Sequence, residues 1–235
     1  MRIQIKYKRI LSMAAGIILS VAVLTFGLIF ANERPGGFID WRMSHAIGVS
    51  GTMHIPIGKT PEEAIEQFRQ SSTMQVIYKE PVKGGMLVFM ERPDPRDSTN
   101  LQIEYIRKTW LGWKWVWGGG YSISLHEKNA VNYMSMPELA HITTPFPAVF
   151  GEVMDPSIKN VTIEIKGKGK YIAKLVKVGP EKIIWFAILP SSGSSPFDIK
   201  AFNEQGDLSA MKTINDPRDS GSIDLLKASA STKGE

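Results

Sequence analysis

Residues 10–30 read ILSMAAGIILSVAVLTFGLIF, a run of 21 residues that contains neither a charge nor a proline. As an α-helix rising about 1.5 Å per residue, this run is about 31 Å long, close to the thickness of a bilayer's hydrocarbon core. The sequence therefore predicts a transmembrane anchor at residues 10–31. A short tail at residues 1–9 precedes the anchor, and a body of about 200 residues follows it.

A cleaved signal peptide is the alternative to an anchor. Ser20-Val21-Ala22 has the small-x-small form that a signal peptidase favours. However, eight largely apolar residues, 23–30, follow this site where a polar mature chain should begin, and Ile29 fits poorly at position −3 of a cut after Ala31. We therefore expect an uncleaved signal-anchor.

The positive charge of the chain is concentrated in front of the anchor. The formal net charge is +5 and the pI is about 9.3, but Arg2, Lys6, Lys8 and Arg9 contribute four of those charges. The remainder is nearly neutral and offers no basic surface for a phosphate backbone, which argues against a nucleic-acid partner. Positive flanks stay in the cytoplasm, so we expect the amino terminus inside and the ectodomain outside the cytoplasmic membrane.

The chain has no cysteine, which excludes disulfides and a lipid-modified cysteine. Hydrophobic residues make up 43% of the chain and charged residues 22%, an ordinary balance for a packed core. Cysteine avoidance is common among exported proteins of Gram-positive bacteria, so an extracellular position at a Gram-positive cell envelope is expected.

Residues 32–59 are predicted to form a juxtamembrane linker or arm, in which Pro35-Gly36-Gly37 is the break. Phe38 and Trp41 are placed where aromatic residues commonly meet the membrane interface.

Residues 60–126 are predicted to form an α+β unit. Thr60-Pro61-Glu62-Glu63 is typical of a helix start, with Thr60 as the cap. Strand patterns with turn signals between them follow this helix. A helix followed by an antiparallel meander has the outline of cystatin-like and NTF2-like folds.

The rest of the chain is predicted to form a second unit. Residues 127–144 are interpreted as a connector, and residues 145–215 as a small all-β, immunoglobulin-like sandwich with a turn signal every 8–12 residues. Residues 183–189 are apolar on both faces, as in a strand that is covered on both sides. Residues 216–235 are polar and are interpreted as a disordered tail.

Four tryptophans are the candidate ligand or partner face. Trp113, Trp115 and Trp117 alternate, so a regular strand would place them on one face, and Trp110 is positioned to join them. An exposed row of indoles can stack on sugar rings of a wall polymer or form a protein interface. The alternative is that the row packs in the core against the predicted helix.

No catalytic, cofactor or metal motif is found. The four histidines, His45, His54, His126 and His141, have no zinc-binding spacing, and there is no nucleophile elbow. The carboxylates of Glu91, Asp94 and Asp97 could gather on one loop, but their spacing matches no known site.

Several short motifs carry a family resemblance. They are Gly112-Trp113-Lys114-Trp115, Phe150-Gly151, Asp155-Pro156-Ser157-Ile158 and Ile184-Trp185-Phe186. With them, roughly residues 70–215 resemble uncharacterised membrane-anchored extracytoplasmic proteins of Gram-positive spore-formers. The resemblance implies the location and the two-part architecture, and it implies no active site.

We therefore expect a non-enzymatic binding, assembly or regulatory role at the cell envelope, with the membrane and a protein at its surface as partners. The alternatives are a cell-wall polysaccharide-binding protein that uses the tryptophan face and an envelope hydrolase that acts through scattered carboxylates.

Overall fold

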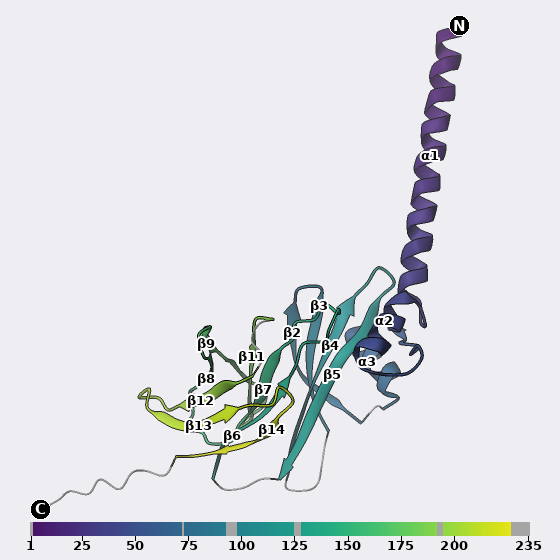
Figure 1. The fold of residues 1–235 in the computed structure, drawn as a ribbon. Helices are drawn as coiled ribbons and strands as arrows, with labels where there is room; N and C mark the ends of the chain where they lie inside the picture. The colour runs from purple at the N-terminus through teal and green to yellow at the C-terminus, as the bar shows by residue number, and fades with distance from the viewer. Residues whose placement is uncertain (1, 72, 93–97, 125–127, 192–194, 227–235) are drawn as a thin grey trace, which may run out of the picture.

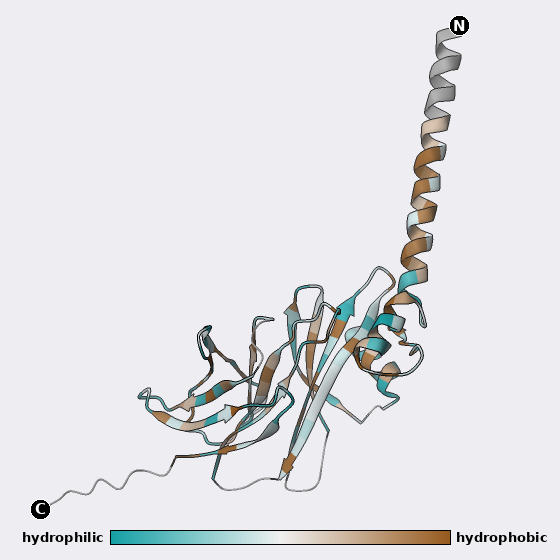
Figure 2. Cartoon of the chain, viewed as in Figure 1, coloured by the Kyte–Doolittle hydropathy of each residue, from teal (hydrophilic) through white to brown (hydrophobic). Residues whose placement is uncertain are grey.

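Helix α1 (Arg2–Glu33) stands clear of the rest of the computed structural model (Figure 1). Figure 2 shows that much of its described length is hydrophobic, and the side chains of Leu19, Leu24 and Phe26 are each more than 60% exposed. In the part of the chain that the structure describes, it is the one helix long and apolar enough to cross a membrane. The predicted apolar amino-terminal helix is confirmed, and it suits a membrane anchor or a signal sequence.

The structure describes residues 2–71, 73–92, 98–124, 128–191 and 195–226, with side chains from Met13 onward. The predicted carboxylates Asp94 and Asp97 and the predicted disordered segment 227–235 lie outside the described residues.

The prediction of a linker at residues 32–59 is wrong for much of that range. Helix α2 (Phe38–Ala46) follows α1 after a short turn, and β1 (Ile57–Gly58) ends the segment. No side chain caps the start of α2, so its local sequence signal is weak. Instead, Ser44 holds the helix in place by donating to the Asp40 carbonyl and accepting from the Met53 N–H.

Five antiparallel strands form sheet A, in the order β1-β5-β4-β3-β2. The additional strands are β2 (Gln75–Val82), β3 (Gly85–Glu91), β4 (Ser98–Lys108) and β5 (Trp113–Ser124). These elements agree with the predicted helix-plus-meander pattern.

Helix α3 (Pro61–Arg69) covers one face of sheet A and begins as predicted. The Thr60 hydroxyl accepts the Glu63 N–H at 3.1 Å, and the Glu63 carboxylate accepts the Lys59 N–H at 2.8 Å. Ala64 and Ile65 of α3 are buried against the sheet.

Two further antiparallel sheets complete the body. Sheet B has the order β10 (Lys174–Lys177), β11 (Ile183–Ile188), β7 (Ala148–Val153), β6 (Asn129–Met136), β14 (Ser220–Asp224). Sheet C has the order β13 (Leu208–Ile214), β12 (Phe197–Phe202), β8 (Asn160–Ile165), β9 (Gly169–Ile172).

Two predictions in this region are corrected. Residues 129–136, expected in a connector, form β6 inside sheet B; the polar residues Asn132 and Ser135 obscure its pattern although both are buried. Residues 220–224, expected in a disordered tail, form β14 at the edge of sheet B. Edge strands are commonly short and polar, and of these five residues only Ile223 is buried, in the core between sheets B and C.

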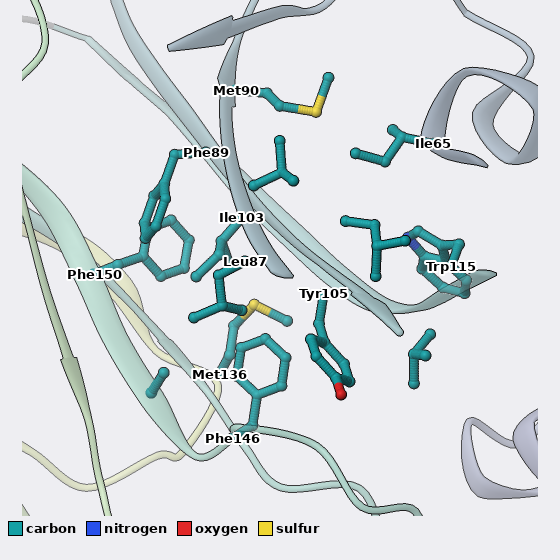
Figure 3. Packing of buried hydrophobic residues seen from close by; sticks show 14 of the residues in the cluster. Ile65, Leu87, Phe89, Met90, Ile103, Tyr105, Trp115, Met136, Phe146 and Phe150 are labelled. Atoms are coloured by element: carbon teal, nitrogen blue, oxygen red, sulfur yellow. The ribbon is translucent and has the colours of Figure 1, made fainter. Parts of the chain in front are cut away.

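Sheet B is covered on both faces, as the apolar run at residues 183–189 predicted. Ile184 and Phe186 belong to the core shared with sheet A, and Trp185 and Ala187 belong to the core shared with sheet C. Figure 3 shows Phe89 of sheet A beside Phe150 of sheet B, and their ring centroids are 6.4 Å apart. The body is therefore a stack of three sheets with α3 on the outer face.

Candidate functional site

The predicted tryptophan row is broken by a β-bulge. In the register of β4 and β5, Trp115 lies opposite Ile106 and Trp117 lies opposite Tyr105, so Val116 is the extra residue. Tyr105 and Ile106 are neighbours in one strand and point to opposite faces of the sheet. Trp117 therefore faces away from Trp115, and the four indoles do not form one face.

Trp115 is a core residue. Its side chain is 4% exposed, and its ring stacks on Phe68 of α3 with 3.8 Å between the centroids and an interplanar angle of 13°. Trp113 is half-buried beneath the Lys108 ammonium, which lies 4.6 Å from the ring centroid. Trp110 is 88% exposed at the turn between β4 and β5. The core interpretation is thus correct for Trp115, and Trp110 alone of the four is fully exposed.

A buried carboxylate lies next to Trp115. Glu104 accepts a hydrogen bond from the Trp115 indole N–H and is paired with Arg69 of α3, whose Nη2 lies 2.7 Å from Oε1. Burial raises the pKa of Glu104, and the charge of Arg69 offsets part of that effect. Gly118 makes room for this carboxylate, because a Cβ at Gly118 would lie 1.7 Å from Glu104 Oε2. These polar groups are satisfied internally, so they serve packing between α3 and sheet A.

The junction between the anchor helix and the body is a second polar cluster. Arg107 of β4 forms a bidentate pair with Glu33, the last residue of α1, with Nη1–Oε1 and Nη2–Oε2 distances of 3.0 and 2.6 Å. A planar guanidinium that binds a carboxylate through two hydrogen bonds fixes orientation as well as distance. The end of α1 is therefore fixed to sheet A and is not followed by a free linker.

A buried ion pair completes the junction. Lys114 Nζ of β5 lies 2.6 Å from Asp40 Oδ1 of α2 and donates to the Glu33 carbonyl at 2.7 Å. The second oxygen of Asp40 accepts the N–H groups of Gly36 and Ile55 at 2.8 and 2.9 Å. Burial lowers the pKa of Lys114, and the carboxylates of Asp40 and Glu33 offset part of that effect.

A cavity of about 150 Å³ opens beside this junction. It is lined by α2, by residues 107 and 114–116 of sheet A, by Ile55 and by residues 141–143, and we call it the junction cleft. At its rim, the guanidinium of Arg42 donates to the His141 carbonyl. The cleft is lined by apolar side chains such as Ile39, Met43 and Ile55 together with charged ones, and its volume suits a few water molecules or one side chain of a partner.

Another charged cluster joins sheets A and B. Lys182 lies between Glu91 of β3 and Glu152 of β7, with 2.7 Å between its Nζ and Glu152 Oε1. Burial raises the pKa of Glu152, and Lys182 offsets part of that effect. Burial lowers the pKa of Lys182, but the two carboxylates outweigh it and the pKa is raised overall. A cavity of about 460 Å³ lies beside Glu152 and Lys182, and we call it the carboxylate pocket.

Within the described residues, no group of three histidine, cysteine or acidic side chains is arranged to hold a metal ion. His45 contacts the Trp41 carbonyl at 2.8 Å, whereas His54 packs near Gly36. His126 lies outside the described residues.

Sequence reasoning missed the junction residues Glu33, Asp40, Arg107 and Lys114. The available signal was Lys114 itself, a lysine between two tryptophans inside a strand pattern. Such a position is half-buried in most sheets and calls for an anionic partner.

Comparisons with models of protein families, with curated proteins and with solved structures find no match. The fold and the site therefore define only a class of protein. Its members have a β-rich body of antiparallel sheets and one amino-terminal apolar helix. The resemblance to membrane-anchored proteins of Gram-positive spore-formers stays a prediction.

Proposed function

We propose that this chain is a single-pass membrane protein with its amino terminus inside the cell, and that its ectodomain has a non-enzymatic binding, assembly or regulatory role at the outer face of the membrane. The observation that carries the proposal is the junction itself. Arg107 and Lys114 of sheet A hold the end of α1 through the Glu33 carboxylate and carbonyl. A passive tether needs no such contacts.

A rigid mount favours a binding role for a physical reason. A body on a flexible linker loses orientational freedom when it meets a partner in the membrane, and that loss weakens binding. A body already fixed on its anchor has lost this freedom in advance. The junction cleft then presents Arg42 and its apolar lining residues at a constant height and orientation relative to the membrane.

The partner is a second membrane-associated protein that places one side chain in the junction cleft. Photo-crosslinking in native membranes tests this, using the full-length protein with a photoreactive amino acid in place of Thr143, at the cleft. The matched control carries it in place of Glu204, in the turn between β12 and β13. A defined protein adduct is expected at 143 and not at 204.

Charge reversal sharpens the test. Arg42→Glu should abolish the adduct at position 143, whereas Arg218→Glu, another exposed arginine, should leave it unchanged. Adducts of equal yield at positions 143 and 204, or an adduct insensitive to Arg42→Glu, would count against a partner at the cleft.

An envelope hydrolase is the second candidate, and one observation favours it. Glu91 and Glu152, from different sheets, converge on Lys182 beside the carboxylate pocket, as paired carboxylates do in glycosidases. It ranks second because Lys182 already neutralises one of the two charges. Release of soluble fragments from purified cell wall, lost in Glu152→Gln and kept in Glu204→Gln, would establish it.

A further inference from the structure

The turn between β4 and β5 holds an indole out into solvent. Trp110 is 88% exposed, the highest exposure among the large apolar side chains of the described residues. The turn is well ordered by hydrogen bonds, because the Thr109 hydroxyl accepts the N–H groups of Leu111 and Gly112 at 3.1 Å each. The Thr109 N–H also donates to the Gly112 carbonyl at 2.7 Å. The protein therefore keeps a large apolar ring exposed on a defined support.

This turn lies at the membrane end of the body. Arg107 precedes Trp110 by three residues, and it binds Glu33 at the end of α1. Figure 1 shows the β4–β5 turn rising beside the lower end of α1. Strands rise about 3.3 Å per residue, so the turn extends roughly 7–10 Å beyond Arg107 and reaches the level of the last turn of α1.

A second exposed aromatic group lies at the same end. Phe38 and Trp41 of α2 are 54% and 44% exposed, and their rings stack with 5.4 Å between centroids. Two exposed lysines flank the turn of Trp110. They are Lys108 and Lys83, and the Lys108 N–H donates to the carbonyl of Gly84, next to Lys83, at 2.9 Å. We call Phe38, Trp41, Lys83, Lys108 and Trp110 together the aromatic rim.

We propose that the aromatic rim lies in the headgroup region of the bilayer and gives the ectodomain a second lipid contact beside α1. This inference rests on the proposed anchoring of α1. Tryptophan is enriched at membrane interfaces because its ring is apolar and its N–H is polar, and lysine extends its ammonium toward the headgroups. The rim has this composition and borders the helix that enters the membrane.

The lipid contact has a geometric consequence. The end of α1, the Phe38–Trp41 stack and the Trp110 turn are three separate supports, and three supports define a plane. The body is then held with the hairpin ends of sheet A at the lipid surface, while sheet C, with its turn at residues 203–207, points away (Figure 1). The plane also brings the junction cleft to the height of the headgroups.

Site-specific fluorescence tests the contact, and the absence of native cysteine makes it clean. The full-length variants Trp110→Cys and Glu204→Cys are labelled with an environment-sensitive fluorophore and reconstituted in vesicles that contain a shallow nitroxide-labelled lipid. We expect at least fivefold stronger lipid quenching at position 110 than at position 204. Equal quenching at the two positions overturns the inference.

The native indole is tested in parallel. In unlabelled protein, brominated lipid should quench part of the tryptophan emission, and Trp110→Ala should remove a measurable share of that quenching. A fluorophore at 110 that becomes protected only in native membranes, and not in pure lipid vesicles, would show a protein contact and overturn the lipid inference. Flotation of the vesicles tests α1 separately: protein that floats but shows no quenching at 110 keeps the anchor and loses the rim.

Discussion

Lys114 and Asp40 form an ion pair 2.6 Å long in which the two side chains are 1% and 0% exposed. The pair joins strand β5 to helix α2 directly beneath the end of α1. Burying two charges is costly, and a buried pair stabilises a fold only when further hydrogen bonds satisfy it. Here the Glu33 carbonyl and two backbone N–H groups do so, and the result is a fixed connection between anchor and body.

Breaking this pair on one side should destabilise the protein strongly. Lys114→Met leaves the Asp40 carboxylate buried and uncompensated, which costs about 3–5 kcal/mol. The double variant Asp40→Asn with Lys114→Met should recover a large part of that loss, because the amide oxygen still accepts the N–H groups of Gly36 and Ile55. Denaturant unfolding of full-length protein in detergent measures the free energy of unfolding of both variants. Losses of stability that add in the double variant would contradict the coupling between Asp40 and Lys114.

Trp115 and Trp110 should differ sharply in their effect on stability. Trp115→Ala removes a buried ring stacked on Phe68 and should cost about 3–5 kcal/mol. Trp110→Ala removes an exposed ring and should change the free energy of unfolding in detergent by less than about 0.5 kcal/mol. Thermal unfolding compares them, and similar losses in the two variants would mean that Trp110 is packed.

Gly118 should tolerate no side chain. A Cβ at this position would lie 1.7 Å from Glu104 Oε2 and 2.8 Å from the Ile103 carbonyl oxygen, so the buried Glu104–Arg69 pair must move. We expect Gly118→Ala to cost about 1–3 kcal/mol, in the range for overpacked cores. Gly179→Ala is the matched control, because its nearest contact is an ordinary 3.6 Å. Equal unfolding midpoints for the two variants would contradict the packing described for Glu104.

Glu104 should make stability depend on pH. Burial raises its folded-state pKa above the ordinary 4.5, so the folded state binds the proton more tightly than the unfolded state. Its contribution is then fully present below the unfolded-state pKa and is lost as the pH rises through the folded-state pKa. Glu104→Gln cannot titrate, so its stability relative to wild type should increase as the pH rises from about 4.5. A stability difference between the variant and wild type that stays constant with pH would show that burial does not shift the pKa of Glu104.

Local sequence signals were sufficient to predict an element wherever its hydrophobic pattern agrees with the burial of its residues in the fold. Strand β7 and strand β12 carry apolar residues at core positions and end at turn residues, and both lie in the range, residues 145–215, where the sequence predicts an all-β unit. Thr60 capped α3 as expected because capping depends only on neighbours in the chain.

The failures have a common physical cause in long-range contacts. The bulge at Val116 depends on the register with β4, so the sequence of β5 alone could not show that Trp117 changes face. Strand β6 carries the buried Asn132, whose side chain finds its partner in another strand and donates to Thr99 of β4 at 2.7 Å. Helix α2 depends on the partners of Asp40 and Ser44, and the junction depends on residues from four elements, α1, α2, β4 and β5.

The rigid junction is tested most directly by a distance measurement between anchor and body. Nitroxide labels introduced by Leu24→Cys in α1 and Gln75→Cys at the start of β2 report their separation by pulsed electron paramagnetic resonance in lipid nanodiscs. We predict one narrow distance distribution, which broadens when Glu33→Ala and Lys114→Met are added. A broad distribution in the otherwise unaltered protein would contradict the rigid mount and, with it, the proposed function.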